Sequence, residues 1–271
     1  MLGKLLKQEA KSQGKTILGM YGALAGASLL VIVLFWISKA AGGPMETIFM
    51  FGCGVYAMTV IVVFIVNFVY LCFHFYQSMY SQQGYLTHTL PVKTTQILHV
   101  KIFVSFVYLF LTGVFAVLSF FLIGFVADGV TLGLSAGASV SVISDSLEMF
   151  LQQVSVEFDM PAAVFLLFVL AVMMLGCLDA LLLFFAGSSI GQLAHRSKGA
   201  CGIAAGIGLY YFSQIVSVIL LMIGAFALFA DARDTQAAPW AMGGSCLMLA
   251  GWAVVYYMIS RIIVQKHLNL E

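Results

Sequence analysis

Charged side chains are scarce in this chain: only 8% of its 271 residues are charged, whereas 62% are hydrophobic. In a soluble domain, about a quarter of the residues are normally charged. So few charges could not cover a water-exposed surface of this size, which makes the lipid bilayer the expected solvent for most of the chain. The net charge of +1 also argues against a nucleic-acid partner, because such partners require dense Lys and Arg surfaces.

Motifs for nucleotide binding, metal binding and catalysis are also missing. Residues 14–16 match the Gly-Lys-Thr end of a G-x-x-x-x-G-K-[ST] phosphate cradle, but Glu9 occupies the place of its first glycine. Two G-x-S-x-G strings, at 133–137 and 187–191, lack the preceding strand that a nucleophile elbow needs, so we interpret both as chance matches. The five cysteines lack zinc-ligand spacing. We therefore expect neither enzymatic activity nor a bound cofactor or metal in this chain.

Long apolar runs are the feature that the sequence has in abundance. Six of them reach the length of about 20 helical residues that crossing a bilayer requires. They cover approximately residues 17–38, 47–73, 102–127, 161–187, 201–230 and 241–263. The sequence therefore predicts an all-α membrane protein, with six transmembrane helices in a single domain over residues 1–271.

The basic residues are distributed unevenly between the two sides of these runs. Of the 12 Lys and Arg residues, all except Lys39 and Arg233 lie before run one, between runs two and three, between runs four and five, or at the end of run six. Cytoplasmic loops of membrane proteins carry such an excess of Lys and Arg. This distribution predicts a multi-pass protein of the cell membrane with both termini in the cytoplasm.

Two stretches outside the runs have an amphipathic pattern. Residues 1–15 place leucines and lysines on different faces, which predicts an interfacial helix on the inner leaflet or, alternatively, a basic tail that only sets topology. The external segment 128–160 ends in an apolar stripe at helical spacing. That stripe, formed by Leu147, Phe150, Leu151, Val154 and Phe158, predicts a short helix that covers the spans.

The cytoplasmic loop 74–101 has a pattern of its own. The second span can continue as a helix to about Tyr80, after which Gly84 and Pro91 interrupt the chain, and Thr94 could begin the next helix. A short helix held parallel to the membrane between two long helices could act as a mechanical handle for a soluble partner. The alternative is an ordinary cytoplasmic loop.

The residues of this loop resemble a known family. The string Gln83-Gly84-Tyr85-Leu86-Thr87-His88-Thr89-Leu90-Pro91-Val92, with Lys101 downstream, is similar to the coupling segment of type-2 ABC transporter permeases. A second string, Ser189-Ile190-Gly191-Gln192-Leu193, followed by Arg196 and Lys198, also resembles the small six-span permeases of Gram-positive bacteria. Both strings lie in the internal cytoplasmic loops, where that family has them.

The resemblance implies a division of labour between subunits. The chain would be the permease of an ATP-driven exporter in a bacterial plasma membrane, working with a second permease copy or a paralogous permease. A separate ATP-binding subunit would hold ATP and Mg, and the exported substrate would be a hydrophobic or amphipathic peptide, lipid or drug. The implied contacts to the ATP-binding subunit are Gln83, Gly84, Tyr85, Leu86, Thr89, Leu90 and Pro91, with Gln192, Arg196 and Lys198 as a weaker second contact.

Several polar residues lie inside the apolar runs, where they are costly unless they find partners. Asp179 is the only acidic residue well inside a run, and Asn67 lies at a similar depth in run two, within reach of a shared hydrogen bond. Such residues either line a substrate path or join helices. Tyr70, Tyr210, Tyr211 and Gln214 could likewise line a path or make polar helix contacts, and the tyrosines could instead be interfacial anchors near the span ends.

Gly202 and Gly206 form a small-xxx-small face on run five, which permits close approach of another helix. That helix could belong to the same chain or, as the family resemblance implies, to a dimer seam. Two other functions remain open at this point. One is a secondary transporter that uses Asp179, and the other is a membrane scaffold or sensor subunit that moves no substrate.

Overall fold

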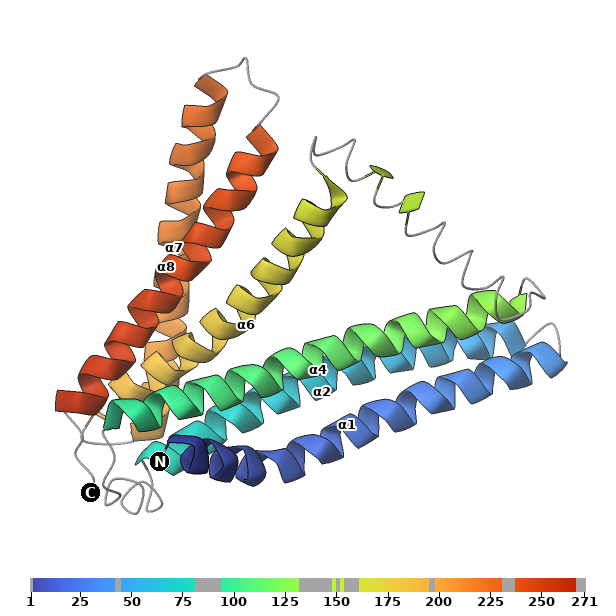
Figure 1. The fold of residues 1–271 in the computed structure, drawn as a ribbon, viewed down its shortest axis with the longest axis horizontal. Helices are drawn as coiled ribbons and strands as arrows, with labels where there is room; N and C mark the ends of the chain where they lie inside the picture. The colour runs from blue at the N-terminus through green and yellow to red at the C-terminus, as the bar shows by residue number, and fades with distance from the viewer. Residues whose placement is uncertain are drawn as a thin grey trace. The chain divides into compact units, whose positions relative to one another are not determined.

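A computed structural model describes residues 2–41, 45–80, 94–131, 148–149, 152–153, 161–194, 198–230 and 237–266. Six long helices dominate these residues, and no strand occurs among them (Figure 1). The helices are α1 (Leu2–Ala41), α2 (Met45–Tyr80), α4 (Thr94–Thr131), α6 (Ala162–Gly191), α7 (Lys198–Ala230) and α8 (Ala237–Lys266). Each is long and apolar enough to cross a membrane. The predicted all-α class with six spans is confirmed, and the chain is a multi-pass membrane protein.

The helices extend beyond the apolar runs that predicted them. We expected a separate interfacial helix over residues 1–15, but α1 continues without a break from Leu2 to Ala41. Its first turns contain no proline and are rich in Leu, Lys, Gln and Glu, which favour a helix. Helix α2 reaches Tyr80, as expected. With 36 residues, α2 is about 54 Å long, well beyond the roughly 30 Å of a hydrocarbon core.

Several predicted segments lie outside the described residues. They include the predicted coupling helix and Arg196, a predicted contact with a partner. Most of the external segment 128–160 also lies outside them, but residues 148–149 and 152–153 of its expected helix are described and are helical. The coupling residues concerned are Gln83, Gly84, Tyr85, Leu86, Thr89, Leu90 and Pro91. Only the two helix ends that flank this segment, Tyr80 and Thr94, are described.

The chain forms two compact units, and each long helix from α1 to α4 contributes to both. One unit comprises residues 8–71 and 107–150. In it, α4 contacts both α1 and α2. The Tyr21 hydroxyl of α1 donates to the Tyr108 carbonyl oxygen of α4 at 3.2 Å. The Tyr56 hydroxyl of α2 donates to the hydroxyl of Ser119 on α4. Hydrogen bonds therefore join all three helices of this unit.

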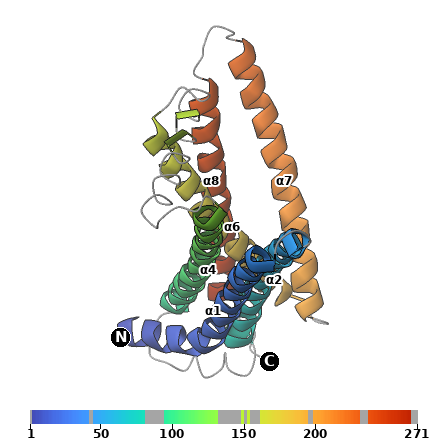
Figure 2. The same ribbon diagram turned by 90° about the vertical axis from the view of Figure 1, so that its right-hand side faces the viewer.

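The other unit comprises residues 1–7, 72–106 and 151–271. Its central helix is α6, which packs against both α7 and α8, whereas α7 and α8 touch each other at few points (Figure 2). The buried side of α6 includes Leu181, Leu182, Phe185 and Ala186. The core of this unit is therefore built around the second half of α6.

Glycine allows α6 and α7 to approach backbone to backbone. A Cβ atom on Gly187 would lie 2.6 Å from the Gly206 Cα, and one on Gly191 would lie 2.4 Å from the Gly202 Cα. Neither distance is compatible with a side chain. We call these four residues the glycine seam. The Gly202–Gly206 face that the sequence singled out thus packs against α6 of the same chain. Its counterpart on α6 is Gly187 and Gly191, so residues 187–191, one of the two G-x-S-x-G strings, serve in helix packing.

The glycine seam generates a stability prediction. Replacing Gly187 by Ala should destabilise the chain by about 1–3 kcal/mol, because the added methyl group forces the two backbones apart. The measurement is the thermal unfolding midpoint of the purified chain in detergent. Gly208→Ala is the matched control on α7, because nothing lies within 4 Å of its added Cβ. The control should leave the midpoint unchanged or raise it, through the helix propensity of alanine. Equal midpoints for the two variants would contradict the seam.

Candidate functional site

The last two turns of α2 are attached to α6 by one ring contact and one hydrogen bond. Phe75 stacks on Phe185, with ring centroids 3.7 Å apart and an interplanar angle of 11°. The Tyr80 and Ser189 hydroxyl groups lie 2.7 Å apart and share a hydrogen bond. The Ser189 hydroxyl also lies 2.7 Å from the Phe185 carbonyl oxygen. The end of α2 that leads into residues 81–93 is therefore held to the core of its unit.

The first turns of α4, on the other side of residues 81–93, are attached to α2. Lys101 is buried, with only 3% of its surface exposed, and its ammonium group donates to the Ser78 hydroxyl at 2.7 Å. A buried ammonium is costly without such partners. The sequence placed Lys101 in a basic cytoplasmic loop, downstream of the predicted coupling segment, whereas in the structure it joins two helices.

The same turns of α4 also reach α8. The His99 Nε2 atom and the Tyr257 hydroxyl oxygen lie 2.6 Å apart, and the two rings stack with centroids 5.5 Å apart. Together, these contacts fasten both helix ends that flank residues 81–93. We call this set the clamp: Phe75, Ser78, Tyr80, His99, Lys101, Phe185, Ser189 and Tyr257.

The second predicted contact with a partner is described only in part. Gln192 follows the last residue of α6, and its side-chain Nε2 atom is buried without a hydrogen-bond partner among the described residues. Lys198 is half-buried and begins α7. These two residues flank the short connection between α6 and α7, next to the glycine seam.

The polar residues predicted inside the spans divide between the two units. Asn67 is fully buried, and its Nδ2 atom donates to the Thr112 hydroxyl of α4 at 2.6 Å. This contact joins α2 to α4, as the helix-joining interpretation of Asn67 predicts. Tyr70 lies half-buried one turn further along α2. Asp179 belongs to the other unit, so its predicted hydrogen bond with Asn67 stays a prediction.

The predicted patch on α7 faces away from the core of its unit. Tyr210 and Tyr211 are 47% and 62% exposed, and Gln214 is exposed as well. The neighbouring Ser213 is buried instead and donates to the Tyr210 carbonyl oxygen at 2.8 Å. In the described chain, α7 therefore turns the Ser213 hydroxyl inward in place of the predicted Tyr210, Tyr211 and Gln214 side chains.

Asp179 of α6 lies in a polar cluster that sequence reasoning did not find. The Tyr256 side chain of α8 is 0% exposed, and Asp179 is close enough to act on its hydroxyl electrostatically. Ser213 of α7 also lies beside that hydroxyl, but without hydrogen-bond geometry. Among the described residues, neither the Asp179 Oδ1 atom nor the Tyr256 hydroxyl has a hydrogen-bond partner.

Aromatic rings extend this cluster along α8. Trp252 stacks on Tyr256 with centroids 5.8 Å apart, and its indole Nε1 donates to the Ser217 hydroxyl of α7 at 2.9 Å. Phe212 of α7 meets the indole edge to face, at 6.2 Å. The sequence carried a signal for this arrangement in two pairs at i, i+4 spacing, Ser213 with Ser217 and Trp252 with Tyr256.

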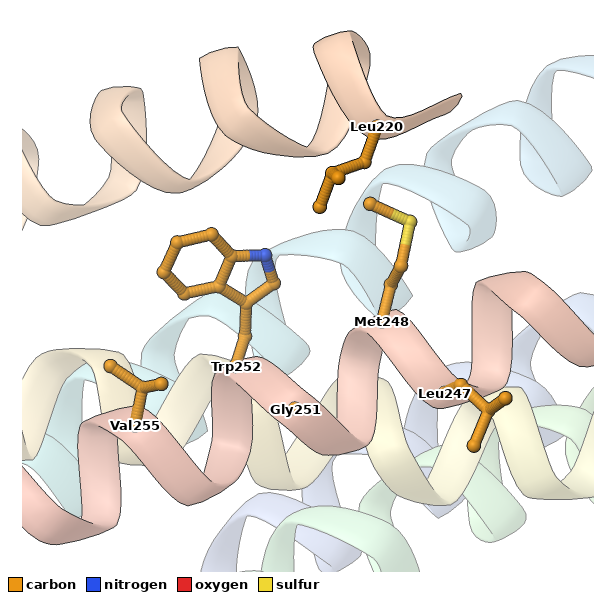
Figure 3. Close-up of a pocket in the computed structure, with 6 residues that line it drawn as sticks. All are labelled: Leu220, Leu247, Met248, Gly251, Trp252 and Val255. Carbon is orange, nitrogen blue, oxygen red and sulfur yellow. The ribbon is translucent and has the colours of Figure 1, made fainter. Parts of the chain in front are cut away.

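An apolar pocket of about 390 Å³ lies next to these rings, between α7 and α8. Figure 3 shows Trp252 and Met248 side by side on α8, pointing toward Leu220 of α7. The lining residues are Leu220, Leu247, Met248, Gly251, Trp252 and Val255. Trp252 therefore belongs to both the pocket wall and the ring stack that leads to Asp179.

Comparison with known proteins identifies no relative: neither a family model, nor a curated protein, nor a solved structure matches the chain. Within the described part of the chain, no three His, Cys, Asp or Glu side chains come together as metal ligands. The candidate sites are therefore the clamp, which can transmit force, and the cluster with its pocket, which can hold a ligand.

The clamp predicts an energetic coupling between Tyr80 and Ser189. Tyr80→Phe and Ser189→Ala should each destabilise the chain, and the double variant should lose about 1 kcal/mol less than the sum, because both remove the same hydrogen bond. Unfolding free energies of the four chains in detergent measure this difference. Tyr211→Phe removes an exposed hydroxyl of α7 and should change nothing. Strict additivity of the two clamp substitutions would rule out the coupling.

Proposed function

We propose that this chain is the permease subunit of an ATP-driven ABC exporter that works with a separate ATP-binding subunit. The clamp is the observation that carries the proposal. Residues 81–93 connect two helices whose ends are fastened to α6 and α8. A push on a segment mounted in this way moves packed helices instead of bending a loose loop. A segment that receives force from a soluble partner requires such a mounting.

The charge distribution supports a cytoplasmic position for this segment. The excess of Lys and Arg favours a cytoplasmic position for the connection after α2, the connection after α6 and both termini. The family resemblance implies that the membrane is a bacterial plasma membrane. A cytoplasmic ATP-binding subunit could then reach residues 81–93, and the connection with Gln192, Arg196 and Lys198 would be its second contact. Because the sequence has no phosphate cradle of its own, the partner would bind ATP and Mg.

The glycine seam bears on how two permease subunits would meet. Gly202 and Gly206 already pack on α6 of the same chain, so a seam with a second permease copy or a paralogue would use the opposite face of α7. That face exposes Ile207, Tyr211 and Ile215. A hydrophobic or amphipathic substrate could move along such a seam as the two copies shift between inward-open and outward-open states.

Copurification tests the partner directly. The tagged chain, extracted from its native membrane, should bring down an ATP-hydrolysing subunit. Leu86→Asp or Leu90→Asp should abolish that association while leaving membrane insertion intact, because a charge would enter an apolar contact. Met149→Asp is the control, since it places the same charge on an exposed residue of the predicted external segment. Normal association in both cytoplasmic variants would reject the coupling assignment.

The clamp variants separate transmission of force from docking. In the purified complex, Tyr80→Phe combined with Ser189→Ala should retain the bound ATP-binding subunit. Its ATP hydrolysis should fall by roughly fivefold, the equivalent of about 1 kcal/mol of lost coupling. The readouts are subunit stoichiometry on a gel and phosphate release. Loss of the subunit itself would show that the clamp serves assembly instead of transmission.

A secondary transporter is the second candidate, and the unpaired groups of Asp179 and Tyr256 are the observation that favours it. Such a protein would move substrate as the purified chain alone in liposomes, driven by an ion gradient and without nucleotide. Full transport activity in an Asp179→Asn variant would exclude a required proton-coupling role for this carboxyl group.

A further inference from the structure

The cluster around Asp179 contains an acidic side chain and two buried polar atoms that are left without partners in the described part of the chain. In the other unit, the Asn67 Nδ2 atom donates to Thr112 at 2.6 Å, and its Oδ1 atom is likewise buried without a hydrogen-bond partner among the described residues, but Asn67 carries no charge. Asp179 and Tyr256 approach each other from α6 and α8, but the Asp179 Oδ1 atom and the Tyr256 hydroxyl form no hydrogen bond among the described residues. Buried polar atoms without partners are costly, so this position is suited to a ligand that supplies the missing contacts.

The charge and the rings around this position define the ligand chemistry. No Lys, Arg or His occurs in α6 or in α8 before Arg261, and on α7 only the first residue is basic. The Asp179 carboxyl group therefore has no cationic neighbour along these helices. The rings of Trp252 and Tyr256 stack nearby at 5.8 Å. A carboxyl group beside aromatic faces favours an organic cation, because both attract positive charge within about 6 Å.

A hard metal ion does not fit this set of groups. Such an ion needs six or more oxygen ligands in hydrophilic surroundings, and no group of three metal-ligating side chains occurs in the described part of the chain. The wall next to the rings is apolar instead: Leu220, Met248 and Val255 line it together with Trp252. Its volume of about 390 Å³ is in the range of small-molecule sites.

The pocket can be reached from outside the unit. Leu247 is 76% exposed, and Leu220 and Val255 are also exposed, so the pocket opens on the surface of α7 and α8. The indole of Trp252 then leads from the rim toward Tyr256 on the next turn. A ligand with an apolar body and one positive charge would place the body in the pocket and the charge toward the Trp252 and Tyr256 rings and Asp179.

We propose that α6, α7 and α8 form a binding site for lipophilic organic cations, with Trp252 and Tyr256 as the aromatic wall and Asp179 as the counter-charge. As a statement about the exporter's substrate, this rests on the proposed function. As a statement about binding, it concerns the single chain and needs neither nucleotide nor an ATP-binding subunit.

Binding of tetraphenylphosphonium to the purified full chain in detergent tests the site. Radiolabelled tetraphenylphosphonium should bind saturably. Asp179→Asn should weaken the affinity at least about tenfold, because the counter-charge is lost. Trp252→Leu should weaken it by roughly fivefold through loss of the cation–π contact. Glu148→Gln removes an equal charge from an exposed residue outside the cluster and should leave the affinity unchanged.

Competition on the unaltered chain keeps the test independent of how the variants fold. Unlabelled tetraphenylphosphonium should displace the radiolabelled probe, whereas neutral triphenylphosphine oxide, which carries three of the same four phenyl groups on phosphorus, should displace it at least about tenfold less well. Equal displacement by the neutral compound would overturn the proposal, and so would unchanged affinity in a monodisperse Asp179→Asn chain. Saturable binding by a chain that copurifies with no ATP-binding subunit would support the cation site and reject the exporter. Copurification of an ATP-binding subunit with a chain that does not bind tetraphenylphosphonium would support the exporter and reject the cation site.

Discussion

The position of α6 depends on the backbone contact in the glycine seam. Helix α6 carries Phe185 and Ser189 of the clamp and Asp179 of the polar cluster. Because Gly187 and Gly191 have no side chains, α7 can approach α6 to a distance that any Cβ atom would prevent. In lipid, helices gain little from hydrophobic association. The van der Waals contact between the two backbones is therefore one of the few interactions that can hold α6 in place. Both candidate sites therefore rely on the same pair of helices.

The two candidate sites use polar groups in opposite ways. In the clamp, each polar group that joins two helices has a partner, as in the Lys101–Ser78 and His99–Tyr257 contacts. Satisfied contacts of this kind make helix ends move together. In the cluster, the Asp179 Oδ1 atom and the Tyr256 hydroxyl lack partners, which leaves part of their binding capacity free. The clamp is thus suited to transmit motion, and the cluster is suited to bind a ligand.

Composition and periodicity were sufficient to predict most of the fold. The six apolar runs became six helices, and α2 ends at Tyr80 as its pattern indicated. The prediction of the helix ends was less accurate. Hydropathy marks the part of a helix that lies in lipid, whereas the backbone stays helical until a helix-breaking residue occurs. Helix α1 shows this clearly, since its basic first turns continue into the span.

The sequence by itself determined the solvent, the number of spans and the Gly202–Gly206 packing face, because these depend on composition and on local spacing. Only the tertiary structure decided which residues meet. It paired Gly202 and Gly206 with α6, turned Ser213 inward in place of Tyr210 and Tyr211, and brought Tyr256 to Asp179. These contacts join segments far apart in the chain, and their partners depend on the rotation and depth at which each helix packs. Neither quantity is encoded in the spacing of residues along a single helix.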